Sequence, residues 1–242
     1  MEKIYSHPKS LRDVSTHYCA GCGHGIVHRL IAEIVDELGI RERVIGIAPI
    51  GCAVVAYDYW DFDCTESAHG RALAVATAIK RVRPKNIVFT YQGDGDLAAI
   101  GTNETIHAAN RGENLTVIFI NNAVYGMTGG QMAPTTLLGQ KTATTPRGRQ
   151  ADLEGYPLKI AEMLAQLPAV KYVERVSLDS PQEIIKTKKA VKQAFQNQID
   201  NVGFSLVEIL SPCPTYWEMP PQKALAWIRN SMIKEFPLGR IK

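Results

Sequence analysis

The sequence predicts a doubly wound α/β fold, in which a mostly parallel sheet carries helices on both faces. Apolar runs of strand length alternate along the chain with segments of helical periodicity, an order typical of parallel sheets. The chain has 242 residues, 45% of them hydrophobic, which is enough for one sizeable core. We therefore expect a single domain that spans residues 1–242.

The first half of the chain is predicted to begin with an amphipathic helix at residues 24–38. Ile26, Leu30 and Ile34 recur at helical spacing, and Gly39 is a typical stop signal. Similar patterns predict the elements that follow, which are a strand at 43–48, a helix at 70–82, a strand at 86–91, a helix at 97–110 and a strand at 115–120.

The second half opens with a long segment, residues 122–156, that has no clear periodicity. It is rich in Gly, Thr and Pro, and loops of this length in compact domains tend to be functional or flexible. The pattern then resumes with a helix at 157–167, a strand at 169–176, a helix at 181–199, a strand at 204–210 and a closing helix at 220–236.

The composition argues against several classes of function. A formal net charge of +3 is spread along the chain, so we expect neither a nucleic-acid nor a membrane surface. No window approaches the roughly 18 uninterrupted apolar residues of a membrane span, and the N-terminus lacks the apolar core of a signal peptide. We expect a cytoplasmic protein, in which five cysteines indicate metal or redox chemistry rather than disulfides.

Four unusual residues each follow the end of a predicted strand. Cys52 follows the strand at 43–48, and Asp94, Asn122 and Cys213 follow three later strands. If these strands are parallel, their carboxyl ends share one edge of the sheet, where open α/β folds bind ligands. The sequence therefore predicts that the four residues lie close together.

The segment GDGD at 93–96 has the character of a turn that binds phosphate and metal. Its glycines allow a tight turn and close backbone approach, and the following helix offers N–H groups to a phosphate. Asp94 supplies a hard oxygen for Mg²⁺, and Asn122 and the carbonyl of Val124 are placed to add two more.

A Gly-Asp-Gly triplet alone is most often a turn with an Asp cap. Here, however, 25 residues separate Gly95 from a pair of asparagines, Asn121 and Asn122. This spacing resembles the thiamine diphosphate motif, in which a Gly-Asp-Gly and a terminal Asn-Asn enclose a strand-turn-helix-strand unit. The two ends together favour a cofactor site over a simple turn.

Four of the five cysteines form a second group. Cys19 and Cys22 make a CxxC pair, which alone fits a zinc half-site, a thiol redox pair or half of a cluster site. No strand pattern precedes the pair, and a zinc site usually needs a second close pair. Cys52 and Cys213 are isolated but lie in segments with Gly or Pro neighbours, whereas Cys64 fits a buried small hydrophobe. His24 is interpreted as the start of a helix rather than a ligand.

Seven motifs, in this order over nearly the whole chain, resemble the β subunit of 2-oxoacid:ferredoxin oxidoreductases. They are CAGCGH at 19–24, IGC at 50–52, HGRA at 69–72, GDGD at 93–96, NN at 121–122, YGMTGGQ at 125–131 and SPCP at 211–214. The resemblance implies the thiamine diphosphate-binding fold and three cofactors, namely thiamine diphosphate, Mg²⁺ and one [4Fe–4S] cluster.

The resemblance also implies roles for individual residues. The expected cluster ligands are Cys19, Cys22, Cys52 and Cys213, and the expected Mg²⁺ ligands are Asp94, Asn122 and Val124. His69 and Arg71 are candidates for catalytic roles, with a structural role open for each, such as anchoring the following helix. The residues expected around thiamine diphosphate are Ile50, Gly51, Cys52, His69, Gly70, Gly93, Asp94, Gly95, Asp96, Asn122, Val124, Tyr125, Gly126, Met127 and Thr128.

The implied activity is oxidative decarboxylation of a 2-oxoacid, either 2-oxoglutarate or a branched-chain acid, to CO₂ and an acyl-CoA. Electrons would pass through the cluster to ferredoxin or to γ- and δ-type subunits. Such enzymes activate the cofactor with a glutamate from a separate domain, so we expect an α-type subunit to complete the site, and coenzyme A binding to involve other subunits.

Three alternatives stay open at this point. The first is pyruvate as substrate, and the second is a non-redox thiamine diphosphate decarboxylase or carboligase with a structural metal site. The third is a small electron-transfer or structural metal module in which the Gly-Asp-Gly is only a turn. The acidic and aromatic segment at 57–67 indicates no function, and we expect it to serve packing.

Overall fold

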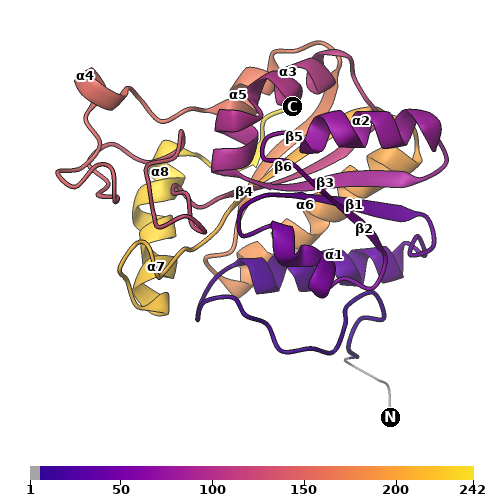
Figure 1. Ribbon diagram of the computed structural model, residues 1–242, viewed down its shortest axis with the longest axis horizontal. Coiled ribbons are helices and arrows are strands. Elements are labelled where there is room, and N and C mark those ends of the chain that lie inside the picture. The colour runs from indigo at the N-terminus through magenta and orange to yellow at the C-terminus, as the bar shows by residue number, and fades with distance from the viewer. Residues whose placement is uncertain (1–5) are drawn as a thin grey trace.

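The computed structural model describes residues 6–242, in which seven strands form one sheet (Figure 1). The order across the sheet is β2-β1-β3-β4-β6-β5-β7, and each neighbouring pair is parallel except β5 with β7. The strands are β1 (Val44–Pro49), β2 (Asp63–Ser67), β3 (Ile87–Gly93), β4 (Thr116–Asn121), β5 (Val170–Ser177), β6 (Phe204–Leu210) and β7 (Gly239–Arg240). This arrangement confirms the predicted fold class.

Helices cover both faces of the sheet, because strands of a central parallel sheet are apolar on both sides (Figure 1). One face carries α1 (His24–Glu37) and α6 (Pro181–Ile199), and the other carries α2 (Ala72–Val82), α3 (Thr102–Asn110) and α5 (Ile160–Ala165). The short α7 (Pro221–Trp227) and α8 (Ile233–Glu235) pack with loops that follow β4 and β6. In Figure 1, α4 (Ala151–Glu154) lies apart from the sheet.

Most element boundaries lie within two residues of the predicted ones, but four predictions need correction. The closing helix expected at 220–236 is divided into α7 and α8 by a π-helical turn at Ile228–Met232. The expected helix at 97–110 is divided, because Asp96–Ile100 is a wider π-helical turn that ends at Gly101, before α3. The helix expected at 157–167 begins only at Ile160, because Lys159 before it has a non-helical backbone, with φ of −92° and ψ of 71°. The fourth correction is β2, an edge strand within the segment at 57–67 that lacks an alternating apolar pattern.

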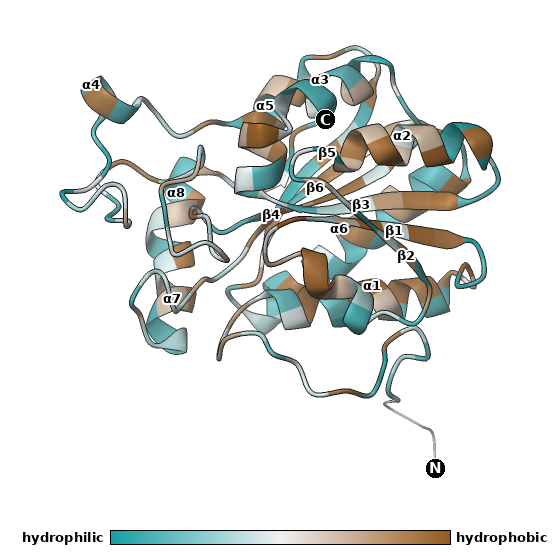
Figure 2. Ribbon diagram, viewed as in Figure 1, coloured by the Kyte–Doolittle hydropathy of each residue, from teal (hydrophilic) through white to brown (hydrophobic). Residues whose placement is uncertain are grey.

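Before β2, the segment at 57–67 contributes Tyr59 and Trp60 to the buried residues, in agreement with its expected packing role, whereas Tyr57 and Asp58 are exposed. Trp60 is fully buried, its ring stacks on Phe62, and its centroid lies 5.3 Å from those of Phe89 and Tyr91. Its indole N–H donates to His28 O at 3.1 Å. Figure 2 shows that β1 and β3 are largely apolar. Within residues 6–242, no helix is both long enough and apolar enough to cross a membrane.

Replacing Trp60 by alanine tests this packing. We expect Trp60→Ala to lower the free energy of unfolding by about 3–5 kcal/mol, because the large ring leaves a cavity that its neighbours fill only in part. Tyr57→Ala is the matched control, since Tyr57 is 40% exposed, and it should change stability by less than about 0.5 kcal/mol. Denaturant unfolding of both variants gives the comparison, and equal losses would contradict the assignment.

Candidate active site

The four residues predicted to share one edge of the sheet do so. The strands β1, β3, β4 and β6 are consecutive and parallel, and Cys52, Asp94, Asn122 and Cys213 follow their carboxyl ends. A cavity opens at this edge. It is lined by His24, Ile50, Gly51, Cys52, Ala53, His69, Gly93, Asp94, Gly95, Asp96, Asn122, Val124, Tyr125, Gly126, Met127 and Thr128. Of the residues predicted around the cofactor, Gly70 alone is absent from this lining.

Asp94 is buried at the base of the cavity and is bound there by neutral donors. Its Oδ1 accepts from the N–H of Gly95 at 2.8 Å, and its Oδ2 accepts from the hydroxyl of Thr135 at 2.6 Å. Burial raises the pKa of Asp94 to about 7. Within residues 6–242 it forms no ion pair. A buried carboxylate is costly without a cation, and this one suits a metal ion.

The turn after β4 carries the other expected metal ligands. Ala123 has a left-handed backbone, with φ of 57°, which a non-glycine residue adopts only where its surroundings enforce it. Its N–H donates to Asn121 Oδ1 at 3.2 Å, and the N–H of Val124 donates to Asn122 Oδ1 at 3.3 Å. The indole of Trp217 donates to Asn122 O at 3.0 Å. The turn therefore presents Asn122 and Val124 at the cavity.

Two glycines of the 93–96 segment have different reasons to lack a side chain. The ring of Tyr125 lies against Gly95, where a Cβ would come within 2.2 Å of it, and the Tyr125 hydroxyl donates to Gly95 O at 3.2 Å. Gly93 lines the cavity, and a Cβ there would meet no atom within 4 Å. Gly95 is therefore needed for packing, whereas Gly93 leaves open space suited to a ligand.

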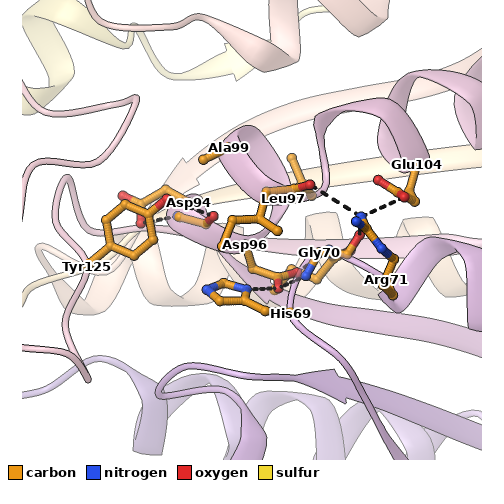
Figure 3. A network of polar contacts seen from close by, with 12 residues as sticks. His69, Gly70, Arg71, Asp94, Asp96, Leu97, Ala99, Glu104 and Tyr125 are labelled. Atoms are coloured by element: carbon orange, nitrogen blue, oxygen red, sulfur yellow. Dashed lines mark hydrogen bonds and ion pairs between the residues drawn. The ribbon is translucent and has the colours of Figure 1, made fainter. Parts of the chain in front are cut away.

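His69 and Arg71 differ in what they face (Figure 3). His69 lines the cavity, and its Nδ1 lies 2.5 Å from Asp96 Oδ1, which also accepts from the N–H of Gly70 at 2.6 Å. Arg71 is not part of the lining, and its guanidinium pairs with Glu104 at 2.6 Å. The geometry favours the anchoring role that the sequence left open for Arg71.

A second cavity adjoins the first and is lined by four of the cysteines. It is lined by His17, Tyr18, Cys19, Cys22, His24, Cys52, Asn122, Gly126, Met127, Cys213, Pro214, Thr215 and Tyr216. Burial raises the pKa of Cys52 to about 11 and that of Cys213 to about 12, so these thiols hold their protons at neutral pH unless a cation binds them. No group of three or more His, Cys, Asp or Glu within residues 6–242 is arranged around a single metal ion.

The CxxC loop reaches this cavity by packing closely on the segment that contains Cys213. A Cβ at Gly23 would lie 2.2 Å from Ser211 Oγ, and one at Gly21 would lie 2.6 Å from Pro221. Cys64 is remote from this group, and burial raises its pKa to about 12, in agreement with its predicted packing role.

The two cavities share a wall formed by His24, Cys52, Asn122, Gly126 and Met127. His24 begins α1, as predicted, but the sequence did not indicate that it lines both cavities. Its Nδ1 lies 2.5 Å from the hydroxyl of Tyr91, and burial lowers its pKa to about 4, which keeps the ring neutral. The signal in the sequence that could have indicated this placement of His24 is its position directly after the CxxC-Gly motif.

The site agrees with the proteins that the chain resembles. The family model for the C-terminal TPP-binding domain of thiamine pyrophosphate (thiamine diphosphate) enzymes matches residues 49–209. The 2-oxoglutarate synthase subunit KorB of Archaeoglobus fulgidus is 40% identical, over 89% of this chain and 76% of that protein. The chain belongs to the thiamine diphosphate-binding subunits of the 2-oxoacid oxidoreductases. This membership confirms the resemblance seen in the sequence motifs.

Two further relatives extend this assignment to the 2-oxoacid oxidoreductases. The ketoisovalerate oxidoreductase subunit VorA of Methanothermobacter thermautotrophicus is 52% identical over the whole chain, which spans about half (53%) of that protein. A solved structure of 2-oxoglutarate:ferredoxin oxidoreductase from Magnetococcus marinus, with 2-oxoglutarate, coenzyme A and succinyl-CoA bound, superposes with a TM-score of 0.76. The two sequences are 30% identical, and the matched region covers 88% of this chain and 70% of the chain in that structure.

The two glycines of this oxidoreductase subunit give a test of the cofactor cavity. We expect Gly93→Ala to weaken thiamine diphosphate binding by about 1–3 kcal/mol while leaving the unfolding of the free protein unchanged, because its methyl group enters empty space. Gly95→Ala should instead destabilise the free protein by about 1–3 kcal/mol, since the Tyr125 ring has to move. Cofactor titration and thermal unfolding separate the two effects, and normal binding by Gly93→Ala would contradict this placement.

Proposed function

We propose that the chain is the subunit of a 2-oxoacid:ferredoxin oxidoreductase that carries both thiamine diphosphate and a [4Fe–4S] cluster. The complex would convert a branched-chain 2-oxoacid to CO₂ and an acyl-CoA. One observation carries this proposal, namely that the cofactor cavity and the four-cysteine cavity share a wall. Such proximity suits the transfer of electrons from one group to the other.

Two sets of residues fit the metals of this activity. Asp94, Asn122 and the carbonyl of Val124 would hold Mg²⁺, which favours oxygen ligands and binds the phosphates of the cofactor. The buried carboxylate of Asp94, without a cationic partner in residues 6–242, supports this assignment. Cys19, Cys22, Cys52 and Cys213 would hold the cluster, which accepts electrons when bound.

The chain's own contribution is binding and orientation. When bound, thiamine diphosphate supplies the carbanion stabilisation that decarboxylation of a 2-oxoacid requires. Gly93 would let the diphosphate approach the backbone, and the ring of Tyr125 packs against Gly95 in the same segment. Asp96 fixes the His69 ring through its Nδ1, so that His69 presents a set orientation to the cavity.

The character of the cavity favours a branched-chain substrate. Its lining within the described residues includes Ile50, Ala53, Val124 and Met127, and it contains no Lys or Arg. The distal carboxylate of 2-oxoglutarate would need a cation, which a partner subunit would have to supply. The relatives named ketoisovalerate oxidoreductase, at 52% identity, support the same choice over the 2-oxoglutarate enzymes at 40%.

A partner subunit of the α type would complete the site. Ile50 and Met127 line the cavity yet are 42% and 46% exposed, and such an apolar rim suits a protein interface. The described lining also contains no glutamate to activate the cofactor. Coenzyme A binding and onward electron transfer, to ferredoxin or to γ- and δ-type subunits, would involve the assembled complex.

Substrate preference tests the proposal directly. The reconstituted complex should form acyl-CoA from 2-oxoisovalerate with a higher kcat/KM than from 2-oxoglutarate or pyruvate, because the apolar lining matches a branched side chain. Acyl-CoA formation with each acid, with ferredoxin as acceptor, gives the ranking. A clear preference for 2-oxoglutarate or pyruvate would overturn the substrate assignment and leave the reaction type in place.

Iron content tests the cluster. The chain purified without oxygen should contain about four irons and four acid-labile sulfides, with a visible absorption that bleaches on reduction. Cys213→Ser should lose most of this absorption, because a buried ligand is removed. Cys64→Ser should keep it, since that thiol lies outside the cavity. Zinc in place of iron, even after anaerobic reconstitution, would contradict the redox assignment.

A further inference from the structure

A buried chain of polar side chains crosses three neighbouring strands beneath the turn that carries Asn122. Glu208 on β6 accepts from Arg175 Nε on β5 at 2.8 Å and from Asn121 Nδ2 on β4 at 2.7 Å. All three side chains are at most 1% exposed. The strand register explains the contacts, since Arg175 is directly opposite Glu208, and Asn121 is diagonal to it.

At the β5 end of this row of polar side chains, Arg175 is held by several further contacts. The guanidinium of Arg175 donates to both carboxylate oxygens of Glu162, at 2.8 and 2.6 Å, and to Pro237 O at 3.1 Å. Its centre lies 5.4 Å from the centroid of the Phe236 ring. Arg175 therefore fixes one side of the Glu208 carboxylate and leaves the other oxygen for Asn121.

The contact with Glu208 decides which way the Asn121 amide faces. A carboxylate paired with arginine only accepts hydrogen bonds, so the NH₂ group of Asn121 has to face it. The carbonyl Oδ1 then faces the other way and accepts from the N–H of Ala123 at 3.2 Å. This bond lies within the left-handed turn at Ala123, between the two expected Mg²⁺ ligands Asn122 and Val124.

We propose that Glu208 and Asn121 are positioning residues for the metal ion, which set the Ala123 turn so that Asn122 and Val124 meet the octahedral geometry of Mg²⁺. The inference rests on the proposed function. Neither residue lines the cavity, so both would act through the turn rather than as ligands. Mg²⁺ demands near-ideal octahedral ligands, whereas the larger Ca²⁺ accepts irregular ones. Loosening the turn should therefore weaken binding of Mg²⁺ more than binding of Ca²⁺.

The test measures metal selectivity rather than activity. Mg²⁺ and Ca²⁺ are titrated separately into the assembled complex with saturating thiamine diphosphate, and binding is followed by calorimetry. Asn121→Ala removes the link to the turn but keeps the ion pair of Glu208 with Arg175. Glu208→Gln keeps the shape of the side chain and removes the charge that orients both neighbours.

A matched control separates positioning from general loss of stability. Lys80 is also buried, and its ammonium donates to Pro84 O and Asn86 O, at 3.1 and 2.7 Å, before β3 and so at the opposite edge of the sheet. Lys80→Met should lower the melting temperature without altering the preference for Mg²⁺ over Ca²⁺.

The expected result is a loss of Mg²⁺ affinity on the order of 10–100-fold in both Asn121→Ala and Glu208→Gln, as for other residues that orient metal ligands, with a smaller loss for Ca²⁺. If the two variants lose affinity equally for Mg²⁺ and Ca²⁺, or lose none, the inference is wrong. Binding of Mg²⁺ by the wild-type complex in the same experiment would still support the proposed function. A wild-type complex that binds thiamine diphosphate without any divalent ion would refute the proposed metal site, and the inference with it.

Discussion

The parallel pairing of β1, β3, β4 and β6 is the constraint on which the rest of the site depends. Because the four strands run parallel, their carboxyl ends lie at a single edge of the sheet, although the residues that follow them are far apart in sequence. A change in the direction of any one strand would remove its residue from the site. The chemistry is thus set by sheet topology before any side chain makes a contact.

Much of this arrangement could be predicted from the sequence, because its signals are local. Apolar periodicity located the main helices and strands, and polar or cysteine residues directly after strands located Asp94, Asn122, Cys52 and Cys213. The π-helical turn after Asp96 could not be predicted, because the helical pattern continues through it. The strand β2 was not predicted from the sequence, because an edge strand with one exposed face can form with few apolar residues.

The contacts of the site that could not be predicted from the sequence share a physical reason. Thr135 bonds Asp94 from within a long loop without periodicity, and Trp217 reaches the carbonyl of Asn122 from the segment after β6. Such contacts depend on how loops fold back over the sheet, which local spacing does not encode. Arg71 is the opposite case. Its place in a motif suggested a role in the cavity, but its guanidinium pairs with Glu104 on α3 instead.

The close packing of the CxxC loop on the Cys213 segment has a consequence for how the protein matures. Cys22 and Cys213 are far apart in sequence, yet both line the same cavity. The four sulfurs therefore come together only when the chain has folded far enough to place the CxxC loop on the Cys213 segment. The proposed cluster, once bound, would act as a cross-link that fastens the N-terminal segment to the C-terminal region.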